Sequence, residues 1–188
     1  IGITGTNGKS TVTALAGEMA RAAGLNTVVA GNIGLPVLDA LREANASGHP
    51  QAWVVELSSY QLETTASLAL DAAAMLNLTQ DHLDRYDTMQ AYAAAKARVF
   101  ARCGTRVLNR DDPWSLGMKG GESVTFGLGE PAQDGEWGIC KGELVRGREP
   151  IVALGEMPLA GEHNAANALA ALALCRGCGL GPEPLARA

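Results

Sequence analysis

A short run near the start of the chain combines glycines with a lysine and hydroxyl side chains. Its members, in order, are Gly5, Thr6, Asn7, Gly8, Lys9, Ser10 and Thr11. Glycine adopts backbone angles that other residues avoid, so successive N–H groups of such a turn can converge on phosphate oxygens. Lys9 can neutralise the outer phosphates, and the Ser10 hydroxyl, with Thr11 beside it, can bind Mg²⁺. The run predicts a nucleotide site, with ATP as the first ligand to consider.

The run departs from the general phosphate-binding pattern at one position. That pattern has a glycine five residues before Gly8, where this chain has Ile3. A glycine-rich turn that only caps a helix is the alternative interpretation. The Gly-Lys-Ser triplet favours phosphate binding because it is specific to such sites.

Two polar residues that follow buried stretches could face a metal bound to the nucleotide. Glu56 ends the apolar stretch 52–55, where P-loop enzymes present an acid to the metal, although a solvated strand end is the alternative. His82 follows the apolar stretch 72–78, at the edge where ligands of open α/β sheets bind. Taken alone, a histidine in a loop is more often structural than a ligand.

Lys96 lies on the apolar face of a predicted helix, in step with Met89, Tyr92 and Cys103. A poorly solvated pocket disfavours the ammonium form, which lowers the pKa of a lysine and yields a neutral amine. Such an amine can add CO₂ to form a carbamate, an anionic oxygen ligand suited to Mg²⁺. A lysine whose ammonium group reaches solvent past neighbouring alanines is the alternative.

Apolar stretches that alternate with helical patterns must position these residues. Helices are expected over 10–23, after Pro36 to about residue 44, over 88–103 and over 162–178, and strands over 27–30, 52–57, 72–78 and 105–108. This alternation predicts an α/β fold of the P-loop type, with a mostly parallel sheet flanked by helices. Short segments from residue 123 onward predict a small antiparallel sheet or flap in the C-terminal half, and 58–61 is expected to be a polar loop.

Composition narrows the class of protein. The chain has 188 residues, 47% of them hydrophobic, which fits one domain with a well-filled core. A net charge of −5 with scattered basic residues argues against a nucleic-acid partner. No apolar stretch approaches the roughly 20 residues of a membrane span. The cysteines are interpreted as reduced, cytoplasmic thiols, and Cys175 and Cys178 as core residues rather than a zinc or redox pair.

Together the motifs resemble the Mur ligases of peptidoglycan synthesis. They comprise the glycine-rich run, Lys96, and the segments Gly31-Asn-Ile-Gly34, Glu56-Leu-Ser-Ser-Tyr-Gln-Leu-Glu63, Asn77-Leu-Thr-Gln-Asp-His-Leu-Asp-Arg-Tyr86 and Gly161-Glu-His-Asn-Ala-Ala-Asn167. The resemblance spans nearly the whole chain and is greatest to the members that add D-glutamate to UDP-N-acetylmuramoyl-L-alanine. It implies that residues 1–188 are the central ATP-binding domain of a longer, three-domain cytoplasmic ligase.

The resemblance also implies which residues would act on ATP and its metal ions. Lys9, Ser10 and the loop amides would hold the phosphates, and Ser10 and Glu56 would share one Mg²⁺. His82 and a carbamylated Lys96 would serve a second Mg²⁺. Lys9, Glu56, His82 and Lys96 would form the catalytic set.

Four asparagine and serine side chains complete the implied site. Asn32 and Ser58 would face the UDP-muramoyl substrate, while Asn164 and Asn167 would contact adenine. Asparagines at this spacing at the start of a helix could instead cap it.

The expected reaction is amide formation through an acyl phosphate, with ADP and phosphate released, and the excised domain alone is expected to be inactive in ligation. One alternative is a Mur-type ligase that adds a different amino acid. Another is a nucleotide-dependent switch module. A second metal site favours synthesis, because a switch has no obvious need for one.

Overall fold

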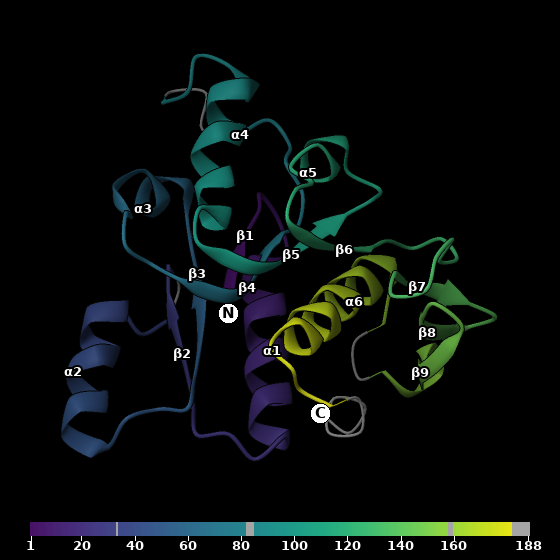
Figure 1. Cartoon of the computed structure of the whole chain (residues 1–188), viewed down its shortest axis with the longest axis horizontal. Coiled ribbons are helices and arrows are strands. Elements are labelled where there is room, and N and C mark those ends of the chain that lie inside the picture. The colour runs from purple at the N-terminus through teal and green to yellow at the C-terminus, as the bar shows by residue number, and fades with distance from the viewer. Residues whose placement is uncertain (33, 82–84, 158–159, 182–188) are drawn as a thin grey trace.

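A nine-stranded mixed sheet runs through the computed structural model, which describes residues 1–32, 34–81, 85–157 and 160–181 (Figure 1). In spatial order its strands are β2 (Thr27–Gly31), β3 (Ala52–Glu56), β1 (Gly2–Thr4), β4 (Leu70–Met75), β5 (Cys103–Asn109), β6 (Glu122–Phe126), β7 (Trp137–Cys140), β8 (Glu143–Arg146) and β9 (Glu149–Ala153). Neighbours from β2 to β7 are parallel, and β7, β8 and β9 pair antiparallel.

The central strand β1 determines where polar side chains gather. It lies between β3 and β4, with Ile3 in register with Glu56 on one side and Ala74 on the other. Because all three strands are parallel, the segments that follow them leave the sheet at the same edge. That edge therefore collects the glycine-rich run, the end of β3 and the start of the loop after β4.

Helices cover both faces of the sheet. They are α1 (Lys9–Ala22), α2 (Val37–Ser47), α3 (Ser59–Thr64), α4 (Met89–Ala97), α5 (Pro113–Leu116) and α6 (Glu162–Gly177), with 3₁₀ turns at Arg98–Phe100 and Leu154–Glu156. Figure 1 shows α1 and α6 side by side on one face and α3 and α4 on the other. None of the helices among the described residues is long and apolar enough to cross a membrane.

Each face has its own apolar core. Under α1 and α6, the core includes Val12 and Leu169, both fully buried, together with a series of buried alanines of α6. Alanine side chains are short, so α6 can approach the sheet closely along much of its length. On the opposite face, Leu62 of α3, Tyr92 of α4 and Leu108 of β5 belong to a second buried apolar cluster.

The expected α/β fold, mostly parallel with an antiparallel part in the C-terminal half, is confirmed. The expectation that residues from 123 onward form antiparallel segments is wrong for β6, which pairs parallel with β5. The short helix α5 provides the crossover that a parallel pair requires, and its single turn gives too little periodicity to be recognised from sequence.

Two further boundaries differ from expectation. Residues 58–61 do not form a loop, because Ser58 and Gln61 make a capping box that begins α3. The helix expected over 88–103 ends as an α-helix at Ala97, and the chain already enters β5 at Cys103.

Cys175 is buried, whereas Cys103, Cys140 and Cys178 are partly buried. All four are free thiols. Burial raises the pKa of Cys175 to about 12 and that of Cys178 to about 11, which keeps both protonated.

The packing of α6 predicts that a leucine in this helix contributes far more to the free energy of unfolding than an exposed leucine elsewhere. Leu169→Ala should lower the free energy of unfolding by about 2–5 kcal/mol, because it leaves a cavity in a fully buried position. Leu38→Ala, on a leucine of α2 that is 74% exposed, is the matched control and should stay within about 0.5 kcal/mol of the parent chain. Urea unfolding followed by circular dichroism measures both, and equal losses in the two variants would contradict the assigned core.

Candidate functional site

The glycine-rich run forms a turn between β1 and α1. Gly5 and Gly8 have φ angles of 154° and 82°, a region that favours glycine. Helix α1 starts at Lys9, and no side chain among the described residues caps it. The first N–H groups of α1 are therefore available to an anion at the positive end of the helix dipole.

Contacts from distant segments hold this turn in shape. The Thr6 and Asn7 amides donate to the main-chain and side-chain oxygens of Asn77 over 2.9 and 2.8 Å, and the Asn77 amide returns a bond to the Asn7 carbonyl. Thr79 donates its N–H to the Thr6 hydroxyl. The sequence places Asn77 in a motif without a role of its own, and the structure shows that it binds the glycine-rich turn to the segment that follows β4.

Glu56 is buried at the end of β3, with 1% of its surface exposed, so the alternative of a solvated strand end is wrong. Asn32 donates its main-chain N–H to the Glu56 carbonyl over 3.0 Å and its side-chain amide to Oε1 over 3.3 Å. A Cβ at Gly31 would lie 2.2 Å from the Glu56 carbonyl oxygen, so the close approach of the two strand ends requires glycine. The structure thus brings Asn32 and Glu56 together.

Lys96 is 2% exposed and lies beneath the turn. Its Nζ donates to the Gly5 carbonyl over 2.8 Å and to Thr4 Oγ1 over 3.4 Å, and it lies 4.9 Å from the centre of the Tyr92 ring. Burial, reinforced by the charge of Lys9, lowers the pKa of Lys96 to about 7, although Asp81 and Glu56 act in the opposite direction. The alternative of a lysine that reaches solvent is therefore wrong.

Lys9, Ser10 and Thr11 open helix α1. The Lys9 ammonium donates to the Thr6 carbonyl over 2.9 Å, within the turn itself. The next two residues, Ser10 and Thr11, lie in the first turn of α1, near the carboxyl edge of the sheet. Ser10 is exposed and Thr11 is half-buried. His82 lies outside the described residues.

The remaining predicted side chains have defined positions. Ser58 accepts a hydrogen bond from the Gln61 amide as the N-cap of α3. Asn167 of α6 lies against the turn, since a Cβ at Gly8 would be 2.5 Å from its Oδ1. The capping alternative for the two asparagines is wrong, because Gly161 is the N-cap of α6 and no described side chain caps it; Asn164 instead donates to the Ala160 carbonyl over 2.8 Å.

The carboxyl edge of the sheet therefore brings together a carboxylate (Glu56), an amine (Lys96) and the N–H and hydroxyl groups at the start of α1. The described part of the chain contains no cluster of three His, Cys, Asp or Glu side chains with metal-binding geometry. The donors that the edge does offer to a hard cation are the buried Glu56 carboxylate and hydroxyl groups at the start of α1.

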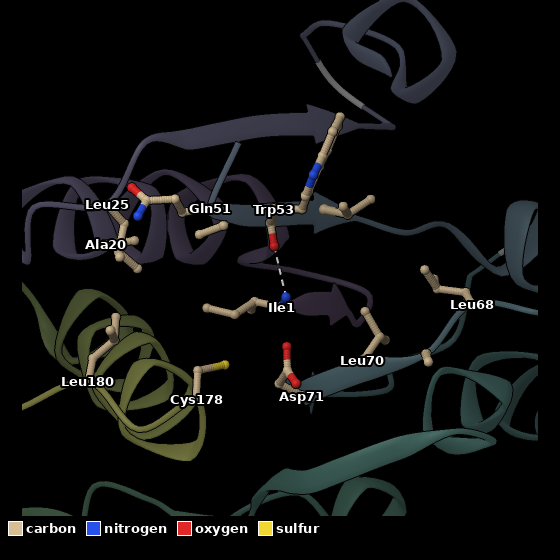
Figure 2. Close-up of a pocket in the computed structure, with 13 residues that line it drawn as sticks. Ile1, Ala20, Leu25, Gln51, Trp53, Leu68, Leu70, Asp71, Cys178 and Leu180 are labelled. Carbon is tan, nitrogen blue, oxygen red and sulfur yellow. Dashed lines mark hydrogen bonds between the residues drawn. The ribbon is translucent and has the colours of Figure 1, made fainter. Parts of the chain in front are cut away.

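A cavity of about 330 Å³ lies at the opposite, amino edge of the sheet (Figure 2). Its walls come from the starts of β1, β3 and β4 and from the ends of α1 and α6, with Trp53, Leu70 and Cys178 among the lining residues. The mostly apolar lining and the distance from the glycine-rich turn separate this cavity from the chemistry described above.

The fold and the turn define the class: a P-loop-type α/β domain in which a glycine-rich turn leads from the central strand into the start of a helix. The sequence model of the Mur ligase middle domain matches residues 3–175, and the chain belongs to this family.

Individual members of the family show which of them the chain is similar to. The chain is 57% identical to the UDP-N-acetylmuramoylalanine–D-glutamate ligase of Thiobacillus denitrificans, over 100% of this chain and 40% of the relative. It is 56% identical to the ligase of the same name from Methylobacillus flagellatus, over 93% of this chain and 39% of the relative. A solved UDP-N-acetylmuramoyl-L-alanyl-D-glutamate–2,6-diaminopimelate ligase matches with a TM-score of 0.81 at 25% identity, over 99% of this chain and 44% of that one. The chain thus spans about 40% of the length of the curated relatives it matches.

Burial of Lys96 should make stability depend on pH. Between about pH 7, its pKa in the folded chain, and 10.5, its ordinary value, the unfolded chain binds a proton that the folded chain does not. The free energy of unfolding therefore rises with pH across this window. Lys96→Met removes the effect, so its stability relative to the parent chain should be greatest near pH 7 and should decrease towards pH 10.

Urea unfolding of both proteins at several pH values measures the difference. Lys119→Met, which replaces an exposed lysine, is the matched control, and its difference from the parent chain should stay within about 0.5 kcal/mol at each pH. A difference for Lys96→Met that does not change with pH would show that Lys96 keeps an ordinary pKa.

Proposed function

We propose that this chain is the central, ATP-binding domain of a three-domain cytoplasmic ligase that joins D-glutamate to UDP-N-acetylmuramoyl-L-alanine. The proposal is carried by three features that meet at one edge of the sheet: the glycine-rich turn of residues 5–8, called the phosphate turn below, the buried Glu56 carboxylate and the buried Lys96 amine. The names of the relatives support the substrates. Their greater length supports flanking domains that would contribute to substrate binding, so residues 1–188 alone are expected to be inactive in ligation.

The phosphate turn would bind the triphosphate of ATP. Its main-chain N–H groups and the start of α1 provide donors and a positive dipole end. Lys9 would exchange its bond to the Thr6 carbonyl for a phosphate oxygen, and Asn164 and Asn167 would contact adenine. The position of Asn167 against Gly8 supports this assignment, because it puts an amide of α6 beside the turn.

The residues present fit Mg²⁺ ions. Glu56 provides carboxylate oxygens and Ser10 a hydroxyl, the hard donors that Mg²⁺ prefers, and they would share one ion. Mg²⁺, when bound, would offset the negative charge that gathers on the transferred phosphoryl group. The low exposure of Glu56 supports the assignment, because a buried carboxylate gains from a cation.

Lys96 would hold the second ion as a carbamate, together with His82. Its amine nitrogen would form a bond to the carbon of CO₂ and release one proton, which leaves an anion with two oxygens. An ammonium group cannot do this, since it has no free electron pair. A pKa of about 7 gives a substantial neutral fraction at neutral pH and so supports this step.

The carboxylate of the L-alanine residue is a poor acyl donor, and the first chemical step would activate it by phosphorylation. The γ-phosphoryl group of ATP passes to the L-alanine carboxylate and leaves ADP, and the D-glutamate amine then attacks the acyl phosphate and expels phosphate. Lys9 and the turn amides would stabilise charge on the phosphoryl group, and no side chain acts as a covalent nucleophile. Asn32, beside Glu56, and Ser58, at the start of α3, would face the reacting end of the UDP-muramoyl substrate.

An assay of the full-length protein that contains this chain tests the proposal. With ATP, Mg²⁺ and UDP-N-acetylmuramoyl-L-alanine, we expect D-glutamate to give an amide product together with equal amounts of ADP and phosphate. A panel of other amino acids is the control. Product with a different amino acid would favour a sister ligase, and ATP hydrolysis that needs neither substrate would favour a nucleotide switch.

The carbamate makes a separate prediction. Lys96→Ala in the full-length protein should lower kcat about 10²-fold or more, because one ligand of the second metal is lost. Short-chain carboxylic acids should restore part of the rate by filling the vacated space. Lys119→Ala should leave the rate unchanged, and a Lys96→Ala variant with the parent rate would remove Lys96 from the mechanism.

A further inference from the structure

The segment between β4 and α4 is held by hydrogen bonds at two described places, residues 77–79 and residues 85–86. Near its start, Asn77 and Thr79 bond to the turn, and the Leu78 amide donates to Asp112 Oδ2 over 3.1 Å. Near its end, Arg85 and Tyr86 bond to Glu63 of α3. The first attachment belongs to the nucleotide site already described, whereas the second has no assigned role.

Glu63 binds two neighbouring residues with its two carboxylate oxygens. Arg85 Nη2 donates to Oε2, and the Tyr86 hydroxyl donates to Oε1 over 2.6 Å. Arg85 and then Tyr86 hold the pKa of Glu63 below its ordinary value, so the carboxylate stays ionised at neutral pH. Hydrogen bonds to an ionised acceptor are stronger than neutral ones and fix geometry on both oxygens.

Tyr86 connects this contact to the buried lysine. Its side chain is 6% exposed, and its ring lies 5.0 Å from the ring of Tyr92, centre to centre. The Tyr92 ring in turn lies 4.9 Å from Lys96 Nζ. A change in the position of Tyr86 would therefore be transmitted through packed rings to the amine.

Helix α3, which carries Glu63, is held by hydrogen bonds at both of its ends. Its N-cap, Ser58, follows Glu56 by two residues, and the capping box between Ser58 and Gln61 fixes the first turn of the helix. At its other end, Arg98 donates to the Leu62 carbonyl over 2.6 Å and to the Thr65 carbonyl over 2.9 Å. Glu63 is thus held relative to Glu56 at the end of β3.

We propose that Glu63 is a positioning residue, which holds Tyr86 and Arg85 so that the end of this loop and the Lys96 amine keep their places relative to Glu56. The inference rests on the proposed function, because Glu56 and Lys96 are its metal-binding groups. The Glu63–Arg85 ion pair is only partly exposed, with 27% of the Glu63 side chain and 52% of the Arg85 side chain accessible to solvent. A pair this open to water contributes little to stability, so the loss of Glu63 should reduce turnover more than folding.

Steady-state kinetics of the full-length protein test this role. Glu63→Ala should lower kcat about tenfold or more with the KM for ATP within about twofold, because Asn77 and Thr79 still hold the turn. Glu63→Gln keeps an acceptor for Tyr86 and should recover part of the loss. Tyr86→Phe should lower kcat as well, and adding it to Glu63→Ala should cost little more, because both remove the same contact.

The matched control is Glu18→Ala, which removes a Glu–Arg ion pair at the surface of α1, between Glu18 and Arg21. It should change neither kcat nor KM. Parent kcat in Glu63→Ala, or a loss that appears entirely as a raised KM for ATP, would overturn the inference. If Glu63→Ala fails to fold by circular dichroism, Tyr86→Phe decides by the same criteria.

Hydrogen exchange separates this inference from the proposed function. Peptides that cover residues 85–92 should exchange faster in Glu63→Ala than in the parent protein, and Glu18→Ala should leave them unchanged. Unchanged exchange in Glu63→Ala would overturn the positioning role whatever the protein catalyses. If exchange is faster in Glu63→Ala but the parent protein makes no amide product, the proposed function is contradicted and the positioning role of Glu63 stands.

Discussion

The candidate site depends on a lysine amine that is kept out of water beneath the backbone of the glycine-rich turn. The buried Lys96 amine has few water contacts, and instead donates a hydrogen bond to the Gly5 carbonyl and lies over the Tyr92 ring. Neither partner carries a full negative charge, so burial outweighs the attraction of Glu56 and Asp81, and the ammonium form becomes unfavourable. Small movements of the turn, of α4 or of Glu56 would change that balance and with it the pKa of Lys96.

The order of the strands makes these restraints possible. With β1 between β3 and β4, three segments far apart in the sequence leave the sheet beside one another. Asn77 binds the turn from the β4 side, and Asn32 reaches Glu56 from the end of β2. Side-chain amides serve this purpose well, because each can donate and accept without adding charge.

The sequence predicts the parts of the structure that depend on local pattern. The glycine-rich turn, the buried strand that ends in Glu56 and the apolar face that holds Lys96 all follow from spacing alone. The bond between Asn7 and Asn77 spans 70 positions, and no local signal announces it. Helix α3 is a different case, since Ser58 and Gln61 have the spacing of a capping box and could have been recognised. The parallel pairing of β6 depends on the tertiary path through α5.

Helix α6 is the last element of the chain described here, and its place beside α1 has a consequence for biosynthesis. Leu169 and its neighbours cover an apolar surface of α1 and the sheet, and Asn167 of the same helix touches Gly8. A chain emerging from the ribosome makes the turn first and the helix that packs beside it more than 150 residues later, at Glu162–Gly177. Until then the apolar surface that α6 will cover stays open to water, and exposed apolar surface of this kind makes a nascent domain prone to aggregate.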